Sequence, residues 1–93
     1  MKNKVLIRLT IPEIDCSYDI FIPVNEIVWK VKKLIIKSIS DLTVGAININ
    51  MDFILINKNN EIIYNNNSIV IDTDIRNATE LIMMLIKKWV KKV

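Results

Sequence analysis

The sequence contains no histidine and only one cysteine and one glycine among its 93 residues. Histidine is the commonest general base and metal ligand, so its absence removes the usual centre of acid–base and metal chemistry. The one cysteine, Cys16, follows an acidic residue and has no histidine to activate it, which is typical of an ordinary thiol. No glycine-rich phosphate loop or other catalytic motif is present. We therefore expect neither enzymatic activity nor a cofactor or metal.

Long hydrophobic runs are also lacking. The longest run, Leu81 to Ile86, is far too short to span a bilayer, and the apolar stretch near the N-terminus is interrupted by Arg8, so no signal peptide is expected. A single cysteine suits a reducing compartment. These features predict a cytoplasmic protein. With 52% hydrophobic residues, the chain can form one globular domain without disulfides.

The net charge of +3 conceals an uneven distribution of basic residues. Eight of the thirteen basic residues gather in two places: Lys30, Lys32, Lys33 and Lys37 in a predicted helix, and Lys87, Lys88, Lys91 and Lys92 near the end of the chain. Five basic residues then remain against all ten acids of the chain, nine of which lie outside the predicted helix, so the rest of the body is acidic. Such charge runs are usually solvated faces, and the other interpretation is a basic surface for an acidic partner or a membrane.

Alternation of apolar and polar residues predicts two strands at the start of the chain. The first covers residues 5–11, and the second covers residues 18–22 with Tyr18, Ile20 and Ile22 on one face. Pro12 and Pro23 end them, because proline has no N–H for the ladder. The connection lacks an Asn-Gly pair, which indicates a wide loop.

A helix is predicted from Asn25 to about Ser40, with Asn25 as its N-cap. Its buried stripe is expected to hold residues that lie on one face of the helix: Ile27, Val31, Leu34, Ile35 and Ser38. Val28 and Ile39 flank this stripe. On a helical wheel with this stripe facing the core, Trp29 and Ile36 point to solvent.

The rest of the chain predicts further strands at Met51–Ile56, Ile62–Tyr64 and Thr79–Ile86, with an asparagine in the left-handed position of the turn at 58–61. This order of elements predicts one α+β domain in residues 1–86, with the helix across one face of a mixed four- to five-stranded sheet. A basic tail, residues 87–93, follows the domain. Six residues are expected to be largely buried: Ile7, Ile20, Val31, Ile35, Ile75 and Leu81.

The segment from Ser68 to Leu81 resembles the end of a ubiquitin superfold domain. In that pattern an apolar residue and an aspartate precede a buried isoleucine, and a tight turn leads to a buried leucine; Val70, Asp72, Ile75 and Leu81 fill these places. The segment 18–23, followed directly by a helix, is similar to the YukD/EsaB proteins of type VII secretion systems in low-GC Gram-positive bacteria. The resemblance covers about residues 4–85.

Two departures from the pattern matter: Ala78 stands where the family often has glycine, and the chain runs past the usual end of the family into residues 87–93, an extension with no counterpart in it. The turn before the last strand often carries glycine in the family, whereas this chain has Ala78; either Ala78 adopts a positive φ at a cost of about 1 kcal/mol, or Asn77 takes the strained position. The only glycine, Gly45, lies far from the last residues, so we expect no Gly-Gly tail and neither conjugation nor sulfur carriage.

The resemblance implies a ubiquitin-like β-grasp protein that docks to secretion machinery as a non-conjugating adaptor or regulatory subunit. The family has no recognised enzymatic activity, and its motif carries no established site residues. A secretion-machinery protein is the expected partner, with self-association as a further expectation.

Two apolar surfaces are candidates for protein binding. If Leu81, Met83 and Leu85 face the helix, the outer face of the sheet presents Ile82, Met84 and Ile86. Leu55 joins them on this face if Ile54 and Ile56 on the third strand point inward. The second surface is Trp29 with Ile36 on the helix. The alternatives are that the tail covers the sheet face and that Trp29 packs on a loop or on the tail.

The tail residues Lys87, Lys88, Trp89, Lys91 and Lys92 combine cations with an interfacial aromatic residue. They leave a second function open, that of a peripheral membrane-surface protein held by its basic tail, since each lysine near an anionic leaflet contributes roughly 1 kcal/mol. Nucleic-acid binding is not expected, because the body outside the helix and tail is acidic.

Overall fold

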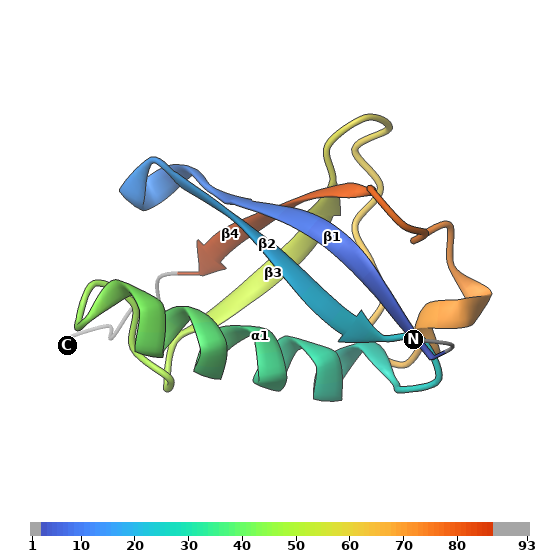
Figure 1. The fold of residues 1–93 in the computed structure, drawn as a ribbon, viewed down its shortest axis with the longest axis horizontal. Coiled ribbons are helices and arrows are strands. Elements are labelled where there is room, and N and C mark those ends of the chain that lie inside the picture. The colour runs from blue at the N-terminus through green and yellow to red at the C-terminus, as the bar shows by residue number, and fades with distance from the viewer. Residues whose placement is uncertain (1–2, 87–93) are drawn as a thin grey trace, which may run out of the picture.

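The sheet in the computed structural model, which describes residues 3–86, has four strands, with one helix across a single face (Figure 1). The elements are the strand β1 (Lys4–Ile11), the 3-10 helix η1 (Pro12–Ile14), the strand β2 (Cys16–Pro23), the helix α1 (Val28–Thr43), the strand β3 (Asp52–Asn57), the 3-10 helix η2 (Val70–Asp72) and the strand β4 (Glu80–Ile86). The strand order is β2-β1-β4-β3. The central pair β1 and β4 is parallel and both outer pairs are antiparallel, which confirms the predicted mixed sheet.

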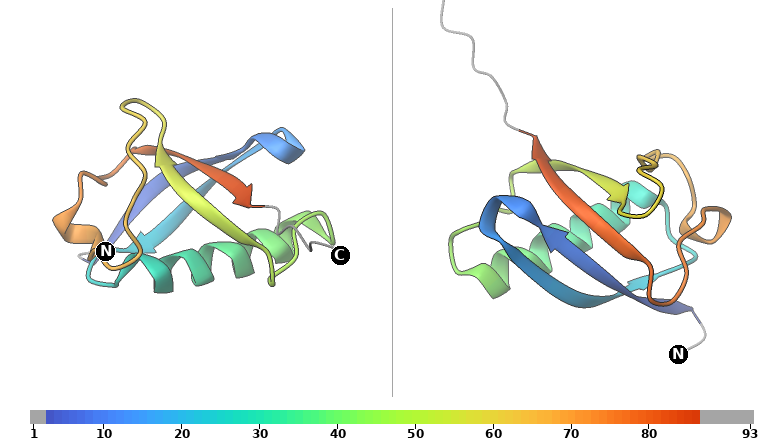
Figure 2. Two further views of the ribbon diagram at one scale, coloured as in Figure 1. Left: turned by 180° about the vertical axis from the view of Figure 1, so that it is seen from behind. Right: turned by 90° about the horizontal axis from the view of Figure 1, so that it is seen from above.

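The predicted strand at Ile62–Tyr64 is wrong. Its pairing with β3 is limited to an isolated bridge from Ile63 to Ile56 and the two backbone hydrogen bonds around it, because the connection after β3 turns away toward the start of α1 (Figure 2). The predicted wide connection between β1 and β2 is confirmed, since η1 and Asp15 form it.

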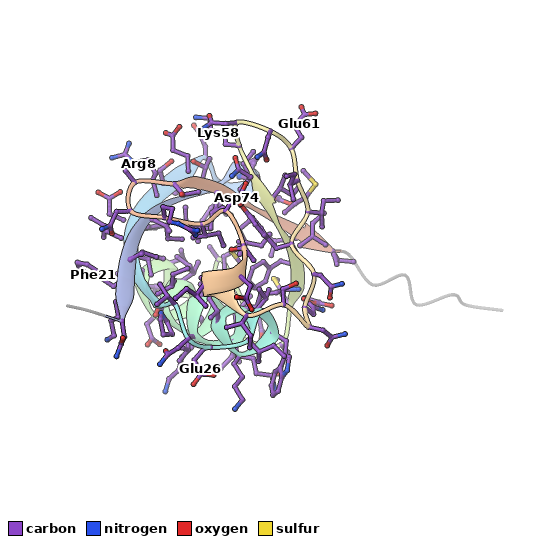
Figure 3. The ribbon with its side chains drawn as sticks, turned by 90° about the vertical axis from the view of Figure 1, so that its right-hand side faces the viewer. Arg8, Phe21, Glu26, Lys58, Glu61 and Asp74 are labelled. Carbon is purple, nitrogen blue, oxygen red and sulfur yellow. The ribbon has the colours of Figure 1, made fainter. Side chains whose placement is uncertain are left out.

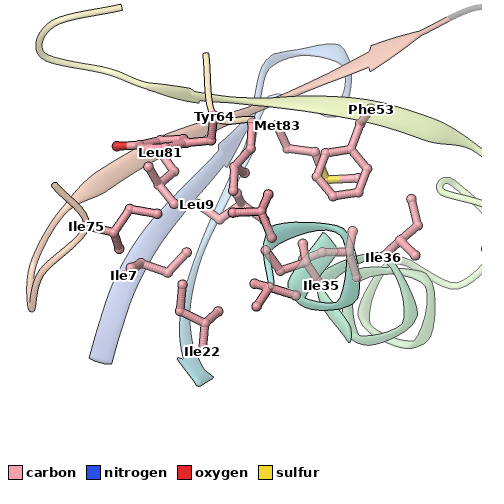
Figure 4. Packing of buried hydrophobic residues seen from close by; sticks show 14 of the residues in the cluster. Ile7, Leu9, Ile22, Ile35, Ile36, Phe53, Tyr64, Ile75, Leu81 and Met83 are labelled. Atoms are coloured by element: carbon pink, nitrogen blue, oxygen red, sulfur yellow. The ribbon is translucent and has the colours of Figure 1, made fainter. Parts of the chain in front are cut away.

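The core lies between α1 and the inner face of the sheet (Figure 4). Alternate residues of β1 and β4 face it: Ile7, Leu9, Ile11, Leu81 and Met83, all at most 1% exposed. Of the six residues predicted to be buried, Ile20 on the edge strand β2 is half-buried, and the other five are fully buried.

The helix begins three residues later than predicted, and Asn25 is not its N-cap. Ile27 occupies the cap position without a side-chain hydrogen bond. The connection after β3 supplies the missing acceptors instead: the Val28 amide donates to the Ser68 carbonyl (2.8 Å) and the Trp29 amide to the Asn66 carbonyl (3.1 Å). Backbone oxygens distant in sequence therefore satisfy N–H groups that an N-cap side chain would otherwise bond.

The buried face of α1 is rotated from the predicted stripe. Its buried residues are Val28, Val31, Ile35, Ile36 and Ile39, whereas Leu34 is 51% exposed. The helix is apolar around most of its circumference, so residue spacing alone admits two faces. Packing against Phe53 and the connection before β3 selects the face that contains Ile36.

Candidate protein-binding surfaces

The outer face of the sheet carries a cluster of aliphatic side chains on β3 and β4. The β3–β4 register pairs Ile54 with Met84 and Ile56 with Ile82, so these side chains are direct cross-strand neighbours. Met84 and Ile86 are 42% and 43% exposed. We call these five residues the β3–β4 outer patch: Ile54, Ile56, Ile82, Met84 and Ile86.

The other half of the outer face is mainly polar. On β1 and β2, Arg8 donates to Asp19 at 3.2 Å, and the hydroxyl groups of Thr10 and Ser17 lie 3.0 Å apart. One exposed apolar pair, Leu6 with Phe21, also lies on β1 and β2, and the larger aliphatic cluster of the outer face lies on β3 and β4. A contiguous aliphatic patch bordered by polar residues is typical of a protein-binding surface.

The predicted direction of the side chains is correct for β4 and wrong for β3. Ile82, Met84 and Ile86 face outward as expected, but Leu55 is 1% exposed and lies in the core. The register places Leu55 opposite the inward-facing Met83, so Ile54 and Ile56 take the outer positions. Residues of one strand alternate between faces, so an error of one residue exchanges the whole set. Asp52 shares a face with Ile54 and indicates the outer face, but Asn57 on the opposite face gives the contrary signal, so the sequence alone did not decide between them.

The predicted pair on the helix is separated by the structure. Trp29 is 40% exposed, as expected, and the ammonium groups of Lys30 and Lys33 lie 5.7 and 5.3 Å from the centre of its ring. Ile36 is only 4% exposed, which contradicts the prediction that it points to solvent. It lies beside Trp29 as part of the floor of a surface hollow, because α1 is rotated toward β3.

A polar cluster closes the end of the molecule that carries Asp74 (Figure 3). The Tyr64 hydroxyl donates to Asp74 Oδ1 at 2.5 Å, and the amide groups of Asn57 and Asn60 donate to Asp74 Oδ2. Burial, and then the Asp74 carboxylate, raise the pKa of Tyr64 to about 12, while the Tyr64 hydroxyl and Asn60 lower the pKa of Asp74. Neither group is poised to exchange a proton near neutral pH, so the cluster suits a structural clamp.

The remaining candidate chemistry is sparse in residues 3–86. Cys16 is half-buried and begins β2, whereas the sequence placed it in the preceding loop. In that range, no group of three or more histidine, cysteine, aspartate or glutamate side chains could hold a metal ion. No helix among the described residues is long and apolar enough to cross a membrane. The predicted membrane contacts, Lys87, Lys88, Trp89, Lys91 and Lys92, lie outside the described residues.

Comparison with known proteins identifies the fold. No protein-family profile and no curated protein sequence matches the chain. One similar structure is a chain of the MycP5-free ESX-5 inner membrane complex in State II, with a TM-score of 0.73 and 10% identity over 98% of this chain. Another is the ubiquitin-like domain of an Arabidopsis thaliana protein, with a TM-score of 0.63 and 15% identity over 89% of this chain and 78% of that chain. The chain therefore has the predicted ubiquitin-like β-grasp fold.

The two neighbours differ greatly in size relative to this chain. The chain spans 23% of the length of the ESX-5 complex subunit that it matches. At such low identities the likeness establishes the shared architecture, and the activities of the neighbours are not transferred by it.

Proposed function

We propose that this chain is a cytoplasmic, non-enzymatic and non-conjugating ubiquitin-like adaptor or regulatory subunit of a bacterial type VII secretion system. It binds a protein of the secretion machinery through the β3–β4 outer patch. The observation that carries the proposal is the contiguous aliphatic surface formed by the register of β3 and β4.

The energetics of the patch favour a binding role. Fully burying an aliphatic side chain contributes about 1.5–3 kcal/mol, so several adjacent side chains can anchor an interface. In the fold, Met84 and Ile86 alternate with the inward-facing Met83 and Leu85, and nothing in the packing of the core requires the outer positions to be apolar. Methionine also adapts to a partner of irregular shape.

The type VII assignment rests on two independent likenesses. The sequence segment 18–23 resembles the YukD/EsaB proteins, and the fold resembles part of a subunit of the ESX-5 inner membrane complex, a type VII secretion assembly. Both likenesses support a partner within secretion machinery.

Secretion by cells that lack this protein tests the proposal. Deletion of the gene should reduce export of small WXG-motif substrates, measured by immunoblotting of the medium, and wild-type protein should restore export. Met84→Asp should fold, because an outward position can hydrate its charge, but should fail to restore export. Phe21→Asp is the matched control, since Phe21 is 59% exposed on β2 of the same sheet face. Full export without the protein would contradict the secretion role, and full rescue by Met84→Asp would contradict the role of the patch.

A further inference from the structure

A surface hollow of about 280 Å³ lies between α1 and β3, away from the β3–β4 outer patch. Its apolar floor is formed by the buried residues Ile36 and Phe53, and the lining also includes Trp29 and Met51, which are 40% and 42% exposed. Pockets for drug-sized ligands usually measure about 300–1,000 Å³. This hollow is at the lower limit of that range and suits an inserted side chain better than a cofactor. We call it the α1–β3 groove.

Within residues 3–86, part of the sheet edge beside the groove is uncovered. The strand β3 is the last in the sheet, and residues 62–64 cover only its second half, through the Asn57 amide bonded to the Ile62 carbonyl (2.8 Å) and the Tyr64 amide bonded to the Leu55 carbonyl (3.0 Å). Backbone groups alternate in direction along a strand, so the amide and carbonyl of Phe53 also point to this edge. No strand among the described residues lies beside Phe53 there.

A carboxylate already occupies part of this edge. The Phe53 amide donates to Asp52 Oδ1 at 2.8 Å, and the Lys32 ammonium lies 3.7 Å from the same oxygen. Lys32 is mostly buried and also donates to the Asn66 side chain at 3.2 Å. Lys33 lines the groove as a second cation. The groove therefore combines a strand edge, an apolar floor and two lysines balanced by one internal acid.

We propose that the α1–β3 groove binds an extended acidic segment of a partner protein. The segment lies beside Phe53 as an added strand, places one aliphatic side chain against Trp29 and Ile36, and directs its carboxylates to Lys32 and Lys33. Main-chain bonds to a free strand edge, with alternate side chains in a groove, are a recurring mode of peptide recognition. Asp52 competes with the segment, because its carboxylate occupies the Phe53 amide and lies close to Lys32. This site is separate from the β3–β4 outer patch and does not rest on the secretion role.

The probe is a fluorescein-labelled nine-residue peptide in which valine and glutamate alternate, and binding is measured by fluorescence anisotropy at low salt. We expect saturable binding, with amide NMR shifts concentrated at residues 52–54 and at the Trp29 indole. Lys33→Glu and Trp29→Ala should each weaken binding about tenfold. Asp52→Ala should tighten it severalfold, because it frees the Phe53 amide and removes a competing charge. Asp52→Asn keeps the acceptor for that amide, so its gain should be smaller.

Matched controls separate this site from general charge and from the outer patch. Lys37→Glu makes the same charge change one turn along α1, and Leu34→Ala truncates an exposed apolar residue outside the groove lining; both should bind like wild type. Met84→Asp should also bind normally. A peptide with proline at its centre should bind at least tenfold more weakly, because proline cannot donate to a strand. Absence of binding, shifts centred on another edge, or equal binding of the proline peptide would overturn the proposal.

Discussion

Four non-glycine residues among those described have a positive φ: Asp15, Val44, Glu61 and Ala78. Ala78, with φ 70°, resolves the two alternatives that the sequence left for the turn before β4. The neighbouring Asn77 side chain instead accepts a hydrogen bond from the Leu6 amide at 2.9 Å, and the Ala78 amide donates to the Leu6 carbonyl at 2.8 Å. These bonds start the parallel pairing of β1 and β4 and hold Ala78 in a strained conformation. Glu61, rather than the expected asparagine, is the left-handed residue of the turn after β3.

Ala78→Gly should therefore stabilise the fold. Relief of the left-handed strain exceeds the entropy that glycine adds to the unfolded chain, giving a net gain of roughly 0.5–1 kcal/mol in the free energy of unfolding. Urea denaturation measures the change. The other alanine, Ala46, is exposed with no positive φ, so Ala46→Gly should lower stability by a few tenths of a kcal/mol or more. Equal effects of the two substitutions would show that Ala78 is unstrained.

The Tyr64–Asp74 clamp predicts how stability depends on pH. The folded-state pKa of Asp74 is lowered, so its contribution is present above the ordinary aspartate pKa and is lost as the pH falls through the lowered value. The pKa of Tyr64 is raised to about 12, so its contribution is complete below pH 10 and is lost as the pH rises toward 12. Thermal melting should show both losses.

Two variants test which residue causes each of these losses of stability. Asp74→Asn should flatten the acid limb of the pH profile, and Tyr64→Phe should reduce the alkaline loss. Part of the alkaline loss should persist in Tyr64→Phe, because desolvation and the neighbouring Cys16 also raise the pKa of Tyr18. A Tyr64→Phe profile that coincides with wild type between pH 10 and 12 would contradict the clamp.

At the scale of elements, α1 shows why residue spacing alone located the helix but not its buried face. Lys30, Lys33 and Lys37 recur at intervals of three and four and mark the solvent face, and the observed buried residues lie opposite them. Lys32 does not fit this spacing of solvent-facing lysines, because its side chain lies at the edge of the buried face and is only 12% exposed. The aliphatic stem of a lysine can pack there while its ammonium reaches a partner.

A matched pair of aspartate substitutions tests which face of α1 is buried. Val31 is 1% exposed, so Val31→Asp should unfold the domain, since an unpaired buried carboxylate is not tolerated. Leu34 is 51% exposed, so Leu34→Asp should fold with stability within about 1 kcal/mol of wild type. Circular dichroism and melting measure both. Unfolding by Leu34→Asp would restore the face that the sequence indicated, and tolerance of Val31→Asp would contradict both faces, because each contains Val31.

The strand β3 shows a second limit of local patterns. Every residue from Phe53 to Ile56 is apolar, so the strand was predicted correctly while its two faces were exchanged. The polar residues at the two ends of β3 indicate opposite outer faces. Asp52 is exposed, whereas Asn57 is buried and bonded to Tyr64 and Asp74. Contacts distant in sequence decide the register, and a local pattern does not contain them.

At the scale of the whole molecule, the chain order and a few anchor residues were sufficient to predict the β-grasp fold. Ile75 and Leu81 are buried as the resemblance implied, and the apolar Val70 is buried with them. The unpredicted features come from the long connection between β3 and β4, which caps α1 and carries the clamp instead of adding a strand. Long-range hydrogen bonds determine that path. The same register that buries Leu55 enlarges the outer patch by Ile54 and Ile56.

Photo-cross-linking in living cells tests the central claim that the β3–β4 outer patch docks to secretion machinery. A photoreactive phenylalanine analogue is introduced at Met84, and in a matched control at Phe21, and cross-linked proteins are identified by mass spectrometry. We predict that the Met84 probe cross-links specifically to a component of the type VII secretion machinery and that the Phe21 probe does not. Equal labelling from both positions, or no secretion component captured from Met84, would contradict the account.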